Sequence, residues 1–469
     1  MTDKLPKKQE FSQWYADIVL KADLIDHTDV SGCSIIKPYS FEIWEKIKQY
    51  LDEEFKKRGV KNAYFPSLIS EDLLQKESDH IEGFAPEVAW VTHGGNTKLG
   101  KRLAIRPTSE TVICKAYSNW IRSHRDLPLK INQWVNVVRW EFKHPTPFLR
   151  GREFLWQEGH TVFANKEEAE KEVHDILKLY KEVYEKLMAI PVIEGKKSEK
   201  EKFAGANYSL SLEAVMEDGK AIQGCTSHYL GTSFAESFDI KYLDENGENK
   251  YVHQNSWGLS TRTIGTIIAV HGDDNGLVLP PKLAPIQAVV VPIVFSKKPK
   301  VSKKINEYTK KISKENNWEL DDRDQSPGFK FNYWELRGVP VRIEVGPRDM
   351  DKGVATLVRR DTGEKNQVKQ ENVSKKVKEL LQQIQKDMLS KQRKKLKQKI
   401  VDVNNMEELK KAINQGKIAR APWQGLPSQE EKIKEETGAK SLNTSLKQTG
   451  KCFMTGKQNQ PLTHFGKTI

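Results

Sequence analysis

Long hydrophobic runs are missing from this sequence. Its 469 residues contain no stretch of about 18 consecutive apolar residues, the length that a membrane-spanning helix needs. The first residues, MTDKLPKKQEFSQWY, also lack the apolar core of a signal peptide. We therefore expect a protein without membrane contact that stays in the cytoplasm.

Cysteine is scarce as well. The four cysteines lie far apart and form no CxxC pair; they are Cys33, Cys114, Cys225 and Cys452. This spacing shows neither a disulfide framework nor a self-evident zinc site, so we expect free thiols. A Walker-type GxxxxGK[ST] loop is also absent, and any nucleotide must therefore be bound by another arrangement.

Basic residues are in excess. The chain has 77 Lys and Arg against 64 Asp and Glu, a formal net charge of +13. Such an excess is typical of proteins that bind a polyanion, most often nucleic acid, but solubility alone explains it equally well. The length favours about three domains. With 37% hydrophobic residues and 11 Trp, the chain can form packed cores and is not disordered.

The first change of pattern falls near residue 283. Residues 1–283 alternate aromatic-rich strands with polar helices, a mixed α/β pattern. After the pair Pro280 and Pro281, the run from Ile286 to Phe295 is apolar on both faces, as in a strand inside a sheet. We predict that a second domain covers residues 284–385. It contains a Lys-rich helix, a turn at Ser326–Phe329, the strand GVPVRIEVG and a hairpin that turns at 361–363.

A second change follows residue 385, where the apolar content falls. The segment KDMLSKQRKKLKQKI, residues 386–400, predicts a strongly basic helix, which indicates either RNA contact or a solvated face. The remaining residues are polar apart from a compact stretch around Trp423, Cys452, Phe453 and Phe465. We predict a third domain over residues 386–469.

The segment from Gln133 to Phe163 predicts an antiparallel hairpin, QWVNVVRWEF and REFLWQEGHTVF, joined by a Pro-containing loop. Because side chains alternate along a strand, Arg139 and Glu141 fall on one face of the first strand. One face of the second strand carries Phe154, Trp156, Glu158 and His160. Buried Arg and Glu are costly unless paired or bound to a ligand, so this collection indicates a binding surface, with a solvated polar face as the alternative.

Three further clusters carry polar side chains at regular spacing. In AIRPTSET, acceptors on Thr108 and Glu110 could hold an ammonium group, although TSE before an apolar run also starts helices. AIQGCTSHYLG offers Gln223, Thr226 and His228 on one side of a strand. NSWGLSTRTIG predicts a Gly-containing turn before a helix that starts near Ser260 and could hold a phosphate with Arg262. The segment Asn165–Met188, by contrast, predicts a capped structural helix with one apolar stripe.

The chain resembles the prolyl-tRNA synthetases, class II aminoacyl-tRNA synthetases of the archaeal and eukaryotic-like type. The likeness covers nearly the whole length, through KNAYFPSLIS, RPTSE, VVRWEFKHPTPFLRGREFLWQEGH, GCTSH, WGLSTRTIG, VHGDDNGLVLPP and WELRGVPVRIEVGPRD. It implies an α/β (α+β) fold. Its parts are a catalytic domain on an antiparallel sheet, an anticodon-binding domain on a mixed sheet and a small α+β C-terminal domain.

The resemblance also implies site residues. Arg139 matches the arginine that grips the ATP α-phosphate and the amino acid carboxylate, and Phe154 the aromatic that stacks on adenine. Arg262 matches the arginine on the γ-phosphate side, and Gln223 lies near a magnesium ion. Further ATP-contacting positions are Glu141, Arg150, Thr226 and Ser260. The proline site would comprise Thr108, Glu110, Arg139, Trp156, Glu158, His160, Phe203 and His228.

Catalysis would then be positioning and cationic stabilisation by Arg139, Arg262 and magnesium, with no protein nucleophile. The implied reaction is activation of L-proline by ATP, followed by transfer to tRNA(Pro). Candidates for anticodon contact are Arg342, Glu344, Arg348 and Lys352, with basic exposed loops as the plain alternative. Homodimerisation follows from the resemblance only.

Two departures from the family are visible. Where the pattern leads us to expect further thiols, the chain has Asn443 and Thr455, leaving Cys452 alone, and one thiolate cannot make a tetrahedral zinc site. We predict no structural zinc and a C-terminal domain that rests on packing of Trp423 and Phe465. Ile469 stands where relatives commonly end in Tyr. The second departure is that only roughly 60 residues separate the second motif from GCTSH, too few for an editing insertion of the bacterial type.

Two alternatives stay open from the residues. One is an enzyme of the same architecture that charges threonine or histidine, which RPTSE and Trp156 disfavour. The other is a catalytically silent relative that only binds tRNA or an amino acid. Retention of Arg139, Glu141, Gln223 and Arg262 argues against it, because a silent protein has no physical need for a cationic phosphate site.

Overall fold

One long sheet runs through most of the molecule. The computed structural model describes residues 5–80, 87–294 and 299–469; Phe295, the last residue of the predicted strand Ile286–Phe295, lies outside them. The sheet has 11 strands in the order β20-β21-β23-β22-β9-β10-β11-β14-β8-β7-β3. Seven strands come from the first 283 residues: β3 (Lys61–Asn62), β7 (Leu129–Val138), β8 (Glu153–Phe163), β9 (Val192–Lys196), β10 (Tyr208–Val215), β11 (Ala221–Gly231) and β14 (His253–Ser260).

The central strands β7, β8, β14, β11, β10 and β9 pair in antiparallel fashion. The predicted hairpin is confirmed, since β7 and β8 pair from Leu129↔Val162 to Val138↔Glu153. One detail of the prediction is wrong. β7 ends at Val138, so Arg139 and Glu141 lie in the connection to β8 and not on a strand face.

Helix α5 (Lys166–Glu182) covers one face of the sheet. Asn165 caps it by accepting a hydrogen bond from the Glu168 backbone N–H at 3.0 Å, as predicted. Its apolar stripe includes Val173, Ile176 and Tyr180, all buried in the largest core cluster. Around this core lie α1 (Phe11–Lys21), α2 (Pro38–Lys57) and α7 (Arg262–His271).

Alternation along β8 separates this core from the opposite face of the sheet. Gln157 donates to the Tyr180 hydroxyl of α5 and Thr161 donates to Glu172 of α5. Trp156, Glu158 and His160 therefore point the other way, as the period of two predicts. Above that face stand α4 (Glu110–Trp120), α6 (Ser233–Phe238) and a second core cluster.

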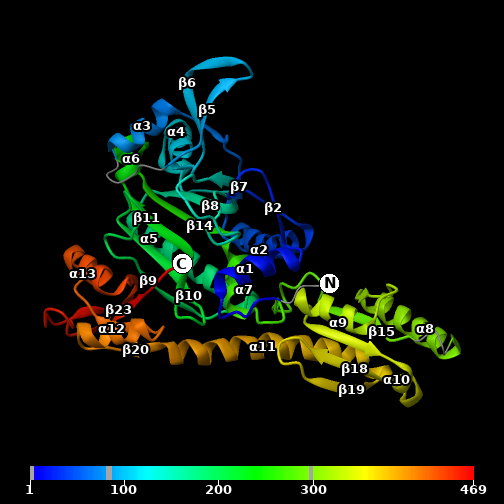
Figure 1. The fold of residues 1–469 in the computed structure, drawn as a ribbon. Coiled ribbons are helices and arrows are strands. Elements are labelled where there is room, and N and C mark those ends of the chain that lie inside the picture. The colour runs from blue at the N-terminus through cyan, green and yellow to red at the C-terminus, as the bar shows by residue number, and fades with distance from the viewer. Residues whose placement is uncertain (1–4, 81–86, 295–298) are drawn as a thin grey trace.

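A three-stranded sheet projects from the body beyond α4 (Figure 1). Its order is β4-β6-β5, and its strands are β4 (Leu68–Ser70), β5 (Trp90–Gly94) and β6 (Thr97–Ile105). Helix α3 (Glu71–His80) follows β4. Two short pairs complete this part of the chain: β1 (Ile25–His27) with β2 (Ser34–Ile36), and β12 (Lys241–Leu243) with β13 (Asn249–Tyr251).

The next part of the chain forms a separate five-stranded mixed sheet, in the order β16-β15-β17-β18-β19. β15 (Ala288–Pro292) is parallel to both its neighbours, while β17, β18 and β19 are antiparallel. The remaining elements are β16 (Glu319–Leu320), β17 (Val341–Val345), β18 (Val354–Arg359), β19 (Lys365–Lys369), α8 (Pro299–Asn316), α9 (Pro327–Leu336) and α10 (Pro347–Lys352).

The predicted hairpin that turns at 361–363 is confirmed by the pairing of β18 with β19. The predicted turn at Ser326–Phe329 is instead the start of α9. Ser326 accepts a hydrogen bond from the Phe329 backbone N–H at 3.3 Å, and Pro327 takes the first helical position. A Ser-Pro pair thus caps a helix here, which is the other common use of this dipeptide.

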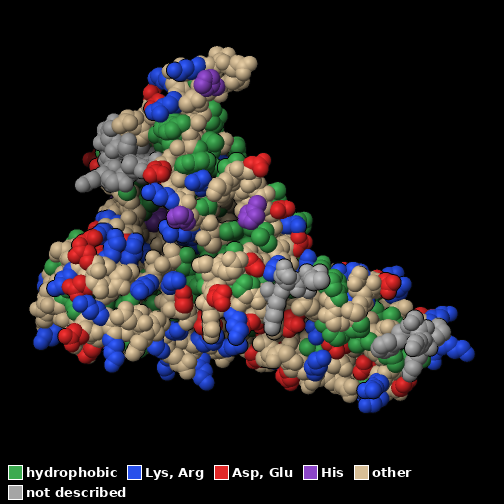
Figure 2. Space-filling view, viewed as in Figure 1, with side chains coloured by type: hydrophobic (Ala, Val, Ile, Leu, Met, Phe, Trp, Pro, Cys, Tyr) green, Lys and Arg blue, Asp and Glu red, His purple; other side chains and the backbone are tan. Residues whose placement is uncertain are grey.

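Helix α11 (Val373–Lys399) is 27 residues long and runs without a break through residues 385 and 386. Figure 1 shows it along the lower edge of the molecule, joining the five-stranded sheet to the C-terminal part. The predicted basic helix is confirmed as its second half. Figure 2 shows basic side chains along this edge. Lys386 and Lys394, in this half of α11, are exposed.

The C-terminal part extends the long sheet. Its elements are β20 (Ile400–Asp402), α12 (Met406–Asn414), β21 (Ile418–Pro422), α13 (Pro427–Thr437), β22 (Lys440–Gly450) and β23 (Gln460–Gly466). β22 joins β9 through Thr444↔Lys196, and Thr468 forms a bridge with Ala221 at the start of β11. The predicted packing of Trp423 on Phe465 is confirmed, with ring centroids 5.4 Å apart. Within the described ranges, no helix combines the length and apolarity needed to cross a bilayer.

Candidate active site

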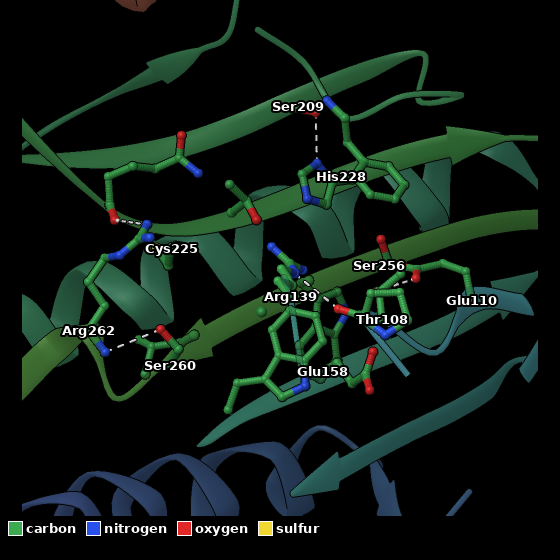
Figure 3. A pocket seen from close by; sticks show the side chains of 18 of the residues that line it. Thr108, Glu110, Arg139, Glu158, Ser209, Cys225, His228, Ser256, Ser260 and Arg262 are labelled. Carbon is green, nitrogen blue, oxygen red and sulfur yellow. Dashed lines mark hydrogen bonds between the residues drawn. The ribbon is translucent and has the colours of Figure 1, made fainter. Parts of the chain in front are cut away.

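A cavity of about 430 Å³ lies on the face of the sheet opposite α5. Strands β8, β11 and β14 form its floor, and Figure 3 shows charged side chains converging on it from several elements. The structure brings 14 of the predicted site residues to this cavity: Thr108, Glu110, Arg139, Glu141, Phe154, Trp156, Glu158, His160, Phe203, Gln223, Thr226, His228, Ser260 and Arg262.

One end of the cavity is acidic and almost fully buried. Thr108 donates a hydrogen bond to Glu110. Glu158, 2% exposed, accepts from Gln133 Nε2 at 2.7 Å and from the Ser109 backbone N–H at 3.2 Å. The oxygens of these two carboxylates can accept hydrogen bonds from the N–H donors of a small cationic ligand. AIRPTSET therefore supplies both a helix start, with α4 beginning at Glu110, and part of the cavity wall.

Glu158 and His160 titrate as a pair, with His160 Nε2 lying 3.1 Å from Glu158 Oε2. Burial opposes ionisation of Glu158, but hydrogen bonds from His160, Ser109 and Gln133 outweigh it and lower its pKa. Burial likewise opposes protonation of His160, yet Glu158 and the charge of Glu110 raise its pKa. Both shifts favour an ion pair between Glu158 and His160.

Arg139 stands between this acidic end and the rest of the cavity (Figure 3). Its Nε donates to the Pro107 carbonyl at 3.0 Å, and its guanidinium lies 5.3 Å from the Trp156 ring and 5.5 Å from the Phe154 ring. These contacts fix the side chain without neutralising its charge. Because β7 ends one residue earlier, the guanidinium can turn across the sheet face toward the cavity.

The other end of the cavity is cationic. The Arg262 guanidinium donates to the backbone carbonyls of Leu149 at 3.0 Å and Gln223 at 3.3 Å. Burial and the nearby charges of Arg139 and Arg150 lower the pKa of Arg262. Arginines held by backbone carbonyls, which orient the guanidinium without cancelling its charge, are suited to a polyanionic ligand.

The helix prediction around Arg262 is correct, but the segment before it is not a turn. NSWG lies within β14, and α7 begins at Arg262 directly after that strand. Ser260 accepts a hydrogen bond from the Arg262 backbone N–H at 3.2 Å. The strand-to-helix junction therefore places both residues on the cavity wall.

A bulge in β11 brings Gln223 and Thr226 to the same face. The two residues are three positions apart, so an unbroken strand would point them in opposite directions. The pairing with β10 shifts here, since Cys225 faces Leu212 and Gln223 faces Glu213, which leaves Gly224 as the extra residue. A Cβ atom on Gly224 would stand 2.3 Å from the Tyr184 hydroxyl oxygen.

His228 and Phe203 line the third side of the cavity, with ring centroids 4.9 Å apart. Ser209 Oγ lies 2.7 Å from His228 Nδ1 (Figure 3). Burial, and then the charge of His160, lower the pKa of His228 to about 3. His228 is therefore neutral at physiological pH and can serve as a hydrogen-bonding wall.

Arg150 is the predicted residue that does not line the cavity. Its guanidinium lies 5.2 Å from the Phe142 ring, in the connection between β7 and β8. Conversely, the structure adds Ser109, Gln133 and Lys197 to the site. Gln133 carried a signal in the sequence, as a polar residue within the apolar strand, and it pairs in register with Glu158.

The four candidates for anticodon contact lie on two elements, with Arg342 and Glu344 on β17 and the other two on α10. Arg342 Nε lies 3.0 Å from Glu344 Oε1, and the Arg342 guanidinium lies 4.3 Å from the Phe331 ring. Lys365 adds a weaker contact to Glu344 at 3.5 Å. Arg348 and Lys352 lie on α10 with exposed side chains.

Comparison with known proteins first defines the class. Residues 91–271, which hold most of the cavity, match the class II tRNA synthetase core domain of the G, H, P, S and T type. Residues 287–380 match an anticodon-binding domain and residues 406–469 match the prolyl-tRNA synthetase C-terminal domain. The chain is thus a class II aminoacyl-tRNA synthetase in architecture.

The particular family follows from full-length relatives. The chain is 49% identical over 462 residues to the proline–tRNA ligase of Ruminiclostridium cellulolyticum, covering 98% of this chain and 96% of the relative. It is 49% identical over 467 residues to that of Alkaliphilus oremlandii, covering 98% and 97%. The bifunctional glutamate/proline–tRNA ligase of Cricetulus griseus is 50% identical over 442 residues, 92% of this chain and 29% of that protein. The chain belongs to the prolyl-tRNA synthetase family.

Proposed function

We propose that this chain activates L-proline with ATP and transfers the prolyl group to the 3′ end of tRNA(Pro). The observation that carries the proposal is the division of one cavity into a buried acidic end and a cationic end, with Arg139 between them. Proline carries an ammonium group and a carboxylate, and ATP is a polyanion. The two substrates need these two environments side by side.

The acidic end would hold proline. The proline ammonium has only two N–H donors, and Thr108 and Glu110 supply acceptors for them. Trp156, His160, His228 and Phe203 would enclose the ring, while Glu158 orients Ser109 and His160. Such a pocket distinguishes proline by its shape and by its secondary amine.

The cationic end would hold ATP. Phe154 offers a ring for the adenine, Arg262 faces the terminal phosphates, and Glu141, Thr226 and Ser260 complete the contacts. Arg150 would reach the phosphates from the loop. The side-chain oxygen of Gln223, on the rim of the cavity, is the kind of hard ligand that would hold magnesium, and the ion would supply positive charge near the phosphates. We therefore propose Gln223 as its protein contact.

Activation would proceed by direct displacement. A proline carboxylate oxygen attacks the α-phosphorus, the bond from that phosphorus to the bridging oxygen breaks, and pyrophosphate leaves. Arg139 touches both reacting groups, so its charge stabilises the negative charge that spreads over the transferred phosphoryl group. A ribose hydroxyl of the tRNA then attacks the prolyl carbonyl and AMP leaves. No side chain becomes covalently modified.

Several further properties are proposed on the family resemblance. They are a homodimer, a cytoplasmic location, domains over 1–283, 284–385 and 386–469, anticodon contacts by Arg342, Glu344, Arg348 and Lys352, and no editing domain in cis. Sedimentation analysis should find twice the chain mass; a monomer at micromolar concentration would refute the dimer. Alanine at Arg342 should weaken charging by raising KM for tRNA and leave proline activation intact.

Structural zinc is not expected in the C-terminal domain. Among the described residues, no three His, Cys, Asp or Glu side chains gather in a way that could hold a metal ion. Asn443 instead donates to the Ile193 and Ser211 carbonyls at 2.8 and 3.1 Å. Metal analysis of the purified chain should find no stoichiometric zinc, and one zinc per chain would overturn this proposal.

Charging of a tRNA(Pro) transcript with labelled proline tests the function. We expect proline-dependent charging that requires ATP, with threonine and histidine inactive as substrates. Charging with threonine or histidine would establish another specificity. Binding of the transcript without charging would indicate a silent tRNA-binding protein.

A further inference from the structure

One cation on the cavity wall has no part in the mechanism above. Lys197 lines the cavity, yet its side chain is only 6% exposed. Its Nζ lies 2.6 Å from Glu213 Oε1, and the Glu213 side chain is 1% exposed. A fully buried ion pair is costly to desolvate and is weak evidence of a role in stability alone.

The strand register places this pair beside the reacting groups. On β10, Ser209, Ser211 and Glu213 stand opposite His228, Thr226 and Gln223 of β11, so their side chains share the cavity face. The Lys197 backbone N–H donates to the Ser209 carbonyl at 2.8 Å, which fixes where its side chain starts. Lys197 therefore lies over β10, across the cavity from Phe154 and Trp156 on β8.

The ammonium group has donors to spare. It carries three N–H bonds, and within the described part of the chain Glu213 is the acceptor that contacts it. A buried donor without an acceptor costs free energy that a bound ligand or water would recover. Because the group also faces a cavity, it is suited to bind an acceptor-rich, anionic ligand.

The neighbouring residues indicate which ligand this is. Lys202, in the same segment, also lines the cavity and pairs with Glu199 at 2.7 Å. Lysines that face a groove are typical of sites for single-stranded nucleic acid ends, whose phosphates they contact. Lys197 lies on a different wall from Arg139 and Arg262, the arginines assigned to ATP. Glu213 stands opposite Gln223, so a ligand held by Lys197 would lie beside the ATP, where the 3′ end of the tRNA must arrive for transfer.

We propose that Lys197, held by Glu213, binds the 3′-terminal nucleotide of the tRNA during the transfer step. The inference rests on the proposed function. It makes Lys197 a binding residue for the transfer step and Glu213 a positioning residue.

The C-terminal part of the chain contacts the Lys197–Glu213 pair through Ser211. Ser211 Oγ lies 3.2 Å from Glu213 Oε1 and 2.7 Å from Asn443 Oδ1. Asn443, on β22, is itself buried and anchored to the Ile193 and Ser211 carbonyls. The end of the chain that joins the long sheet thus fixes the position of Glu213 and, through it, of Lys197.

The test separates a role of the Lys197 charge from a role of the ion pair in folding. Lys197→Met alone leaves the Glu213 charge buried and unpaired, which could disturb the fold. The double variant Lys197→Met/Glu213→Gln removes both charges with nearly the same shapes. Lys200→Met is the matched control, because Lys200 lies three residues away, is exposed and pairs with Glu431 outside the cavity.

Two activities of the full chain are compared, together with a thermal melt. They are proline-dependent exchange of pyrophosphate into ATP without tRNA, and single-turnover transfer from bound prolyl-adenylate to a tRNA(Pro) transcript. We expect the double variant to melt like the parent and to exchange within about twofold of it, while transfer at subsaturating tRNA falls by about tenfold or more. Lys200→Met should match the parent in both.

Three results would overturn the proposal. Transfer by the double variant at the rate of the parent would show that the Lys197–Glu213 pair has only a structural role. A parallel loss of exchange and transfer would assign Lys197 to ATP or to folding. Absence of proline-dependent exchange in the parent itself would overturn the proposed function and, with it, this role for Lys197.

Discussion

The charged side chains at the cavity are buried and held in place by hydrogen bonds. Glu158 and Glu110 are 2% and 4% exposed and remain close to hydrogen-bond donors. Arg139 and Arg262 are held by backbone carbonyls, which orient a guanidinium without cancelling its charge. The cavity therefore presents fixed charges of both signs before any ligand arrives, which lowers the cost of reorganisation during the reaction.

Removal of the central cation should abolish activation. We predict that Arg139→Ala lowers proline-dependent pyrophosphate exchange by at least about 100-fold, because in the proposed mechanism Arg139 stabilises charge that develops in the transition state. Its carbonyl partner Pro107 can be solvated from the cavity, so the fold should survive. Pyrophosphate exchange and circular dichroism are the measurements.

Arg102→Ala provides the control, since Arg102 is exposed on β6 and pairs with Glu71 away from the cavity. A folded Arg139→Ala variant that still exchanges at the rate of Arg102→Ala would disprove the role of Arg139.

The low pKa of His228 predicts how the free energy of unfolding depends on pH. The folded value is about 3, below the unfolded value of about 6.5, because burial disfavours the imidazolium. Its contribution to stability is therefore present above pH 6.5 and is lost as the pH falls toward 3. His160 has the opposite sign: its raised pKa adds stability below pH 6.5 that is lost as the pH rises.

Between pH 6.5 and pH 4, the free energy of unfolding should fall less in His228→Gln than in the parent. The difference between the two losses should be roughly 3 kcal/mol or less. Urea unfolding at several pH values is the measurement, and His93→Gln, at an exposed position on β5, is the control. An equal acid loss in parent and His228→Gln would show that His228 is not the group that titrates.

The sequence predicts those candidate site residues that follow the regular alternation of side chains along a strand. Glu158 and His160 stand at every second position of a strand, and such a face is unusual for a core. Lys197 could not be found this way. Lys197 lies in an irregular segment, and its partner Glu213 is 16 residues away on strand β10. Only the folded chain brings the two together.

The elements meet the cavity at three irregular points: the end of β7, the β11 bulge and the junction of β14 with α7. Each breaks a regular pattern and re-aims a side chain, as bulges near active sites often do. The long periodic segments, such as α5 and β8, were predictable. The end of β7 and the start of α9 were not, because local propensity continues while tertiary contacts change the chain direction.

The β11 bulge yields a prediction for an element. We expect Gly224→Ala to destabilise the fold by about 2 kcal/mol and to raise KM for ATP, since its Cβ would meet the Tyr184 hydroxyl at 2.3 Å and push Gln223 out of line. Urea unfolding and pyrophosphate exchange at varied ATP test it.

Gly100→Ala is the matched control, because a Cβ there meets no atom within 4 Å. Unchanged stability and KM for ATP in Gly224→Ala, relative to Gly100→Ala, would refute the importance of the bulge.

The whole molecule is tied together by the long sheet and by α11. β22 completes the edge of β9, and Gln385 of α11 donates to the Lys186 and Leu187 carbonyls at 3.0 Å each. Its carboxamide oxygen also accepts from the Lys282 backbone N–H at 3.1 Å. The class and the order of the parts were predictable from motifs. The continuous sheet was not, because strand pairing across about 250 residues leaves no local pattern.

This continuity predicts that the C-terminal part is not a removable module. Truncation after residue 402 would expose the edge of β9 and leave the partners of Asn443 unsatisfied. We expect the truncated chain to aggregate or to melt well below the full chain, as judged by gel filtration and calorimetry. A monodisperse truncated chain with normal pyrophosphate exchange would contradict this account.

In the proposed mechanism, one cavity holds proline at its acidic end and ATP at its cationic end. Proline-dependent exchange of labelled pyrophosphate into ATP, without tRNA, tests it most directly. We predict exchange with proline, weak exchange with alanine, and none with threonine or histidine. A folded protein that binds tRNA(Pro) but shows no exchange with any amino acid would contradict the account.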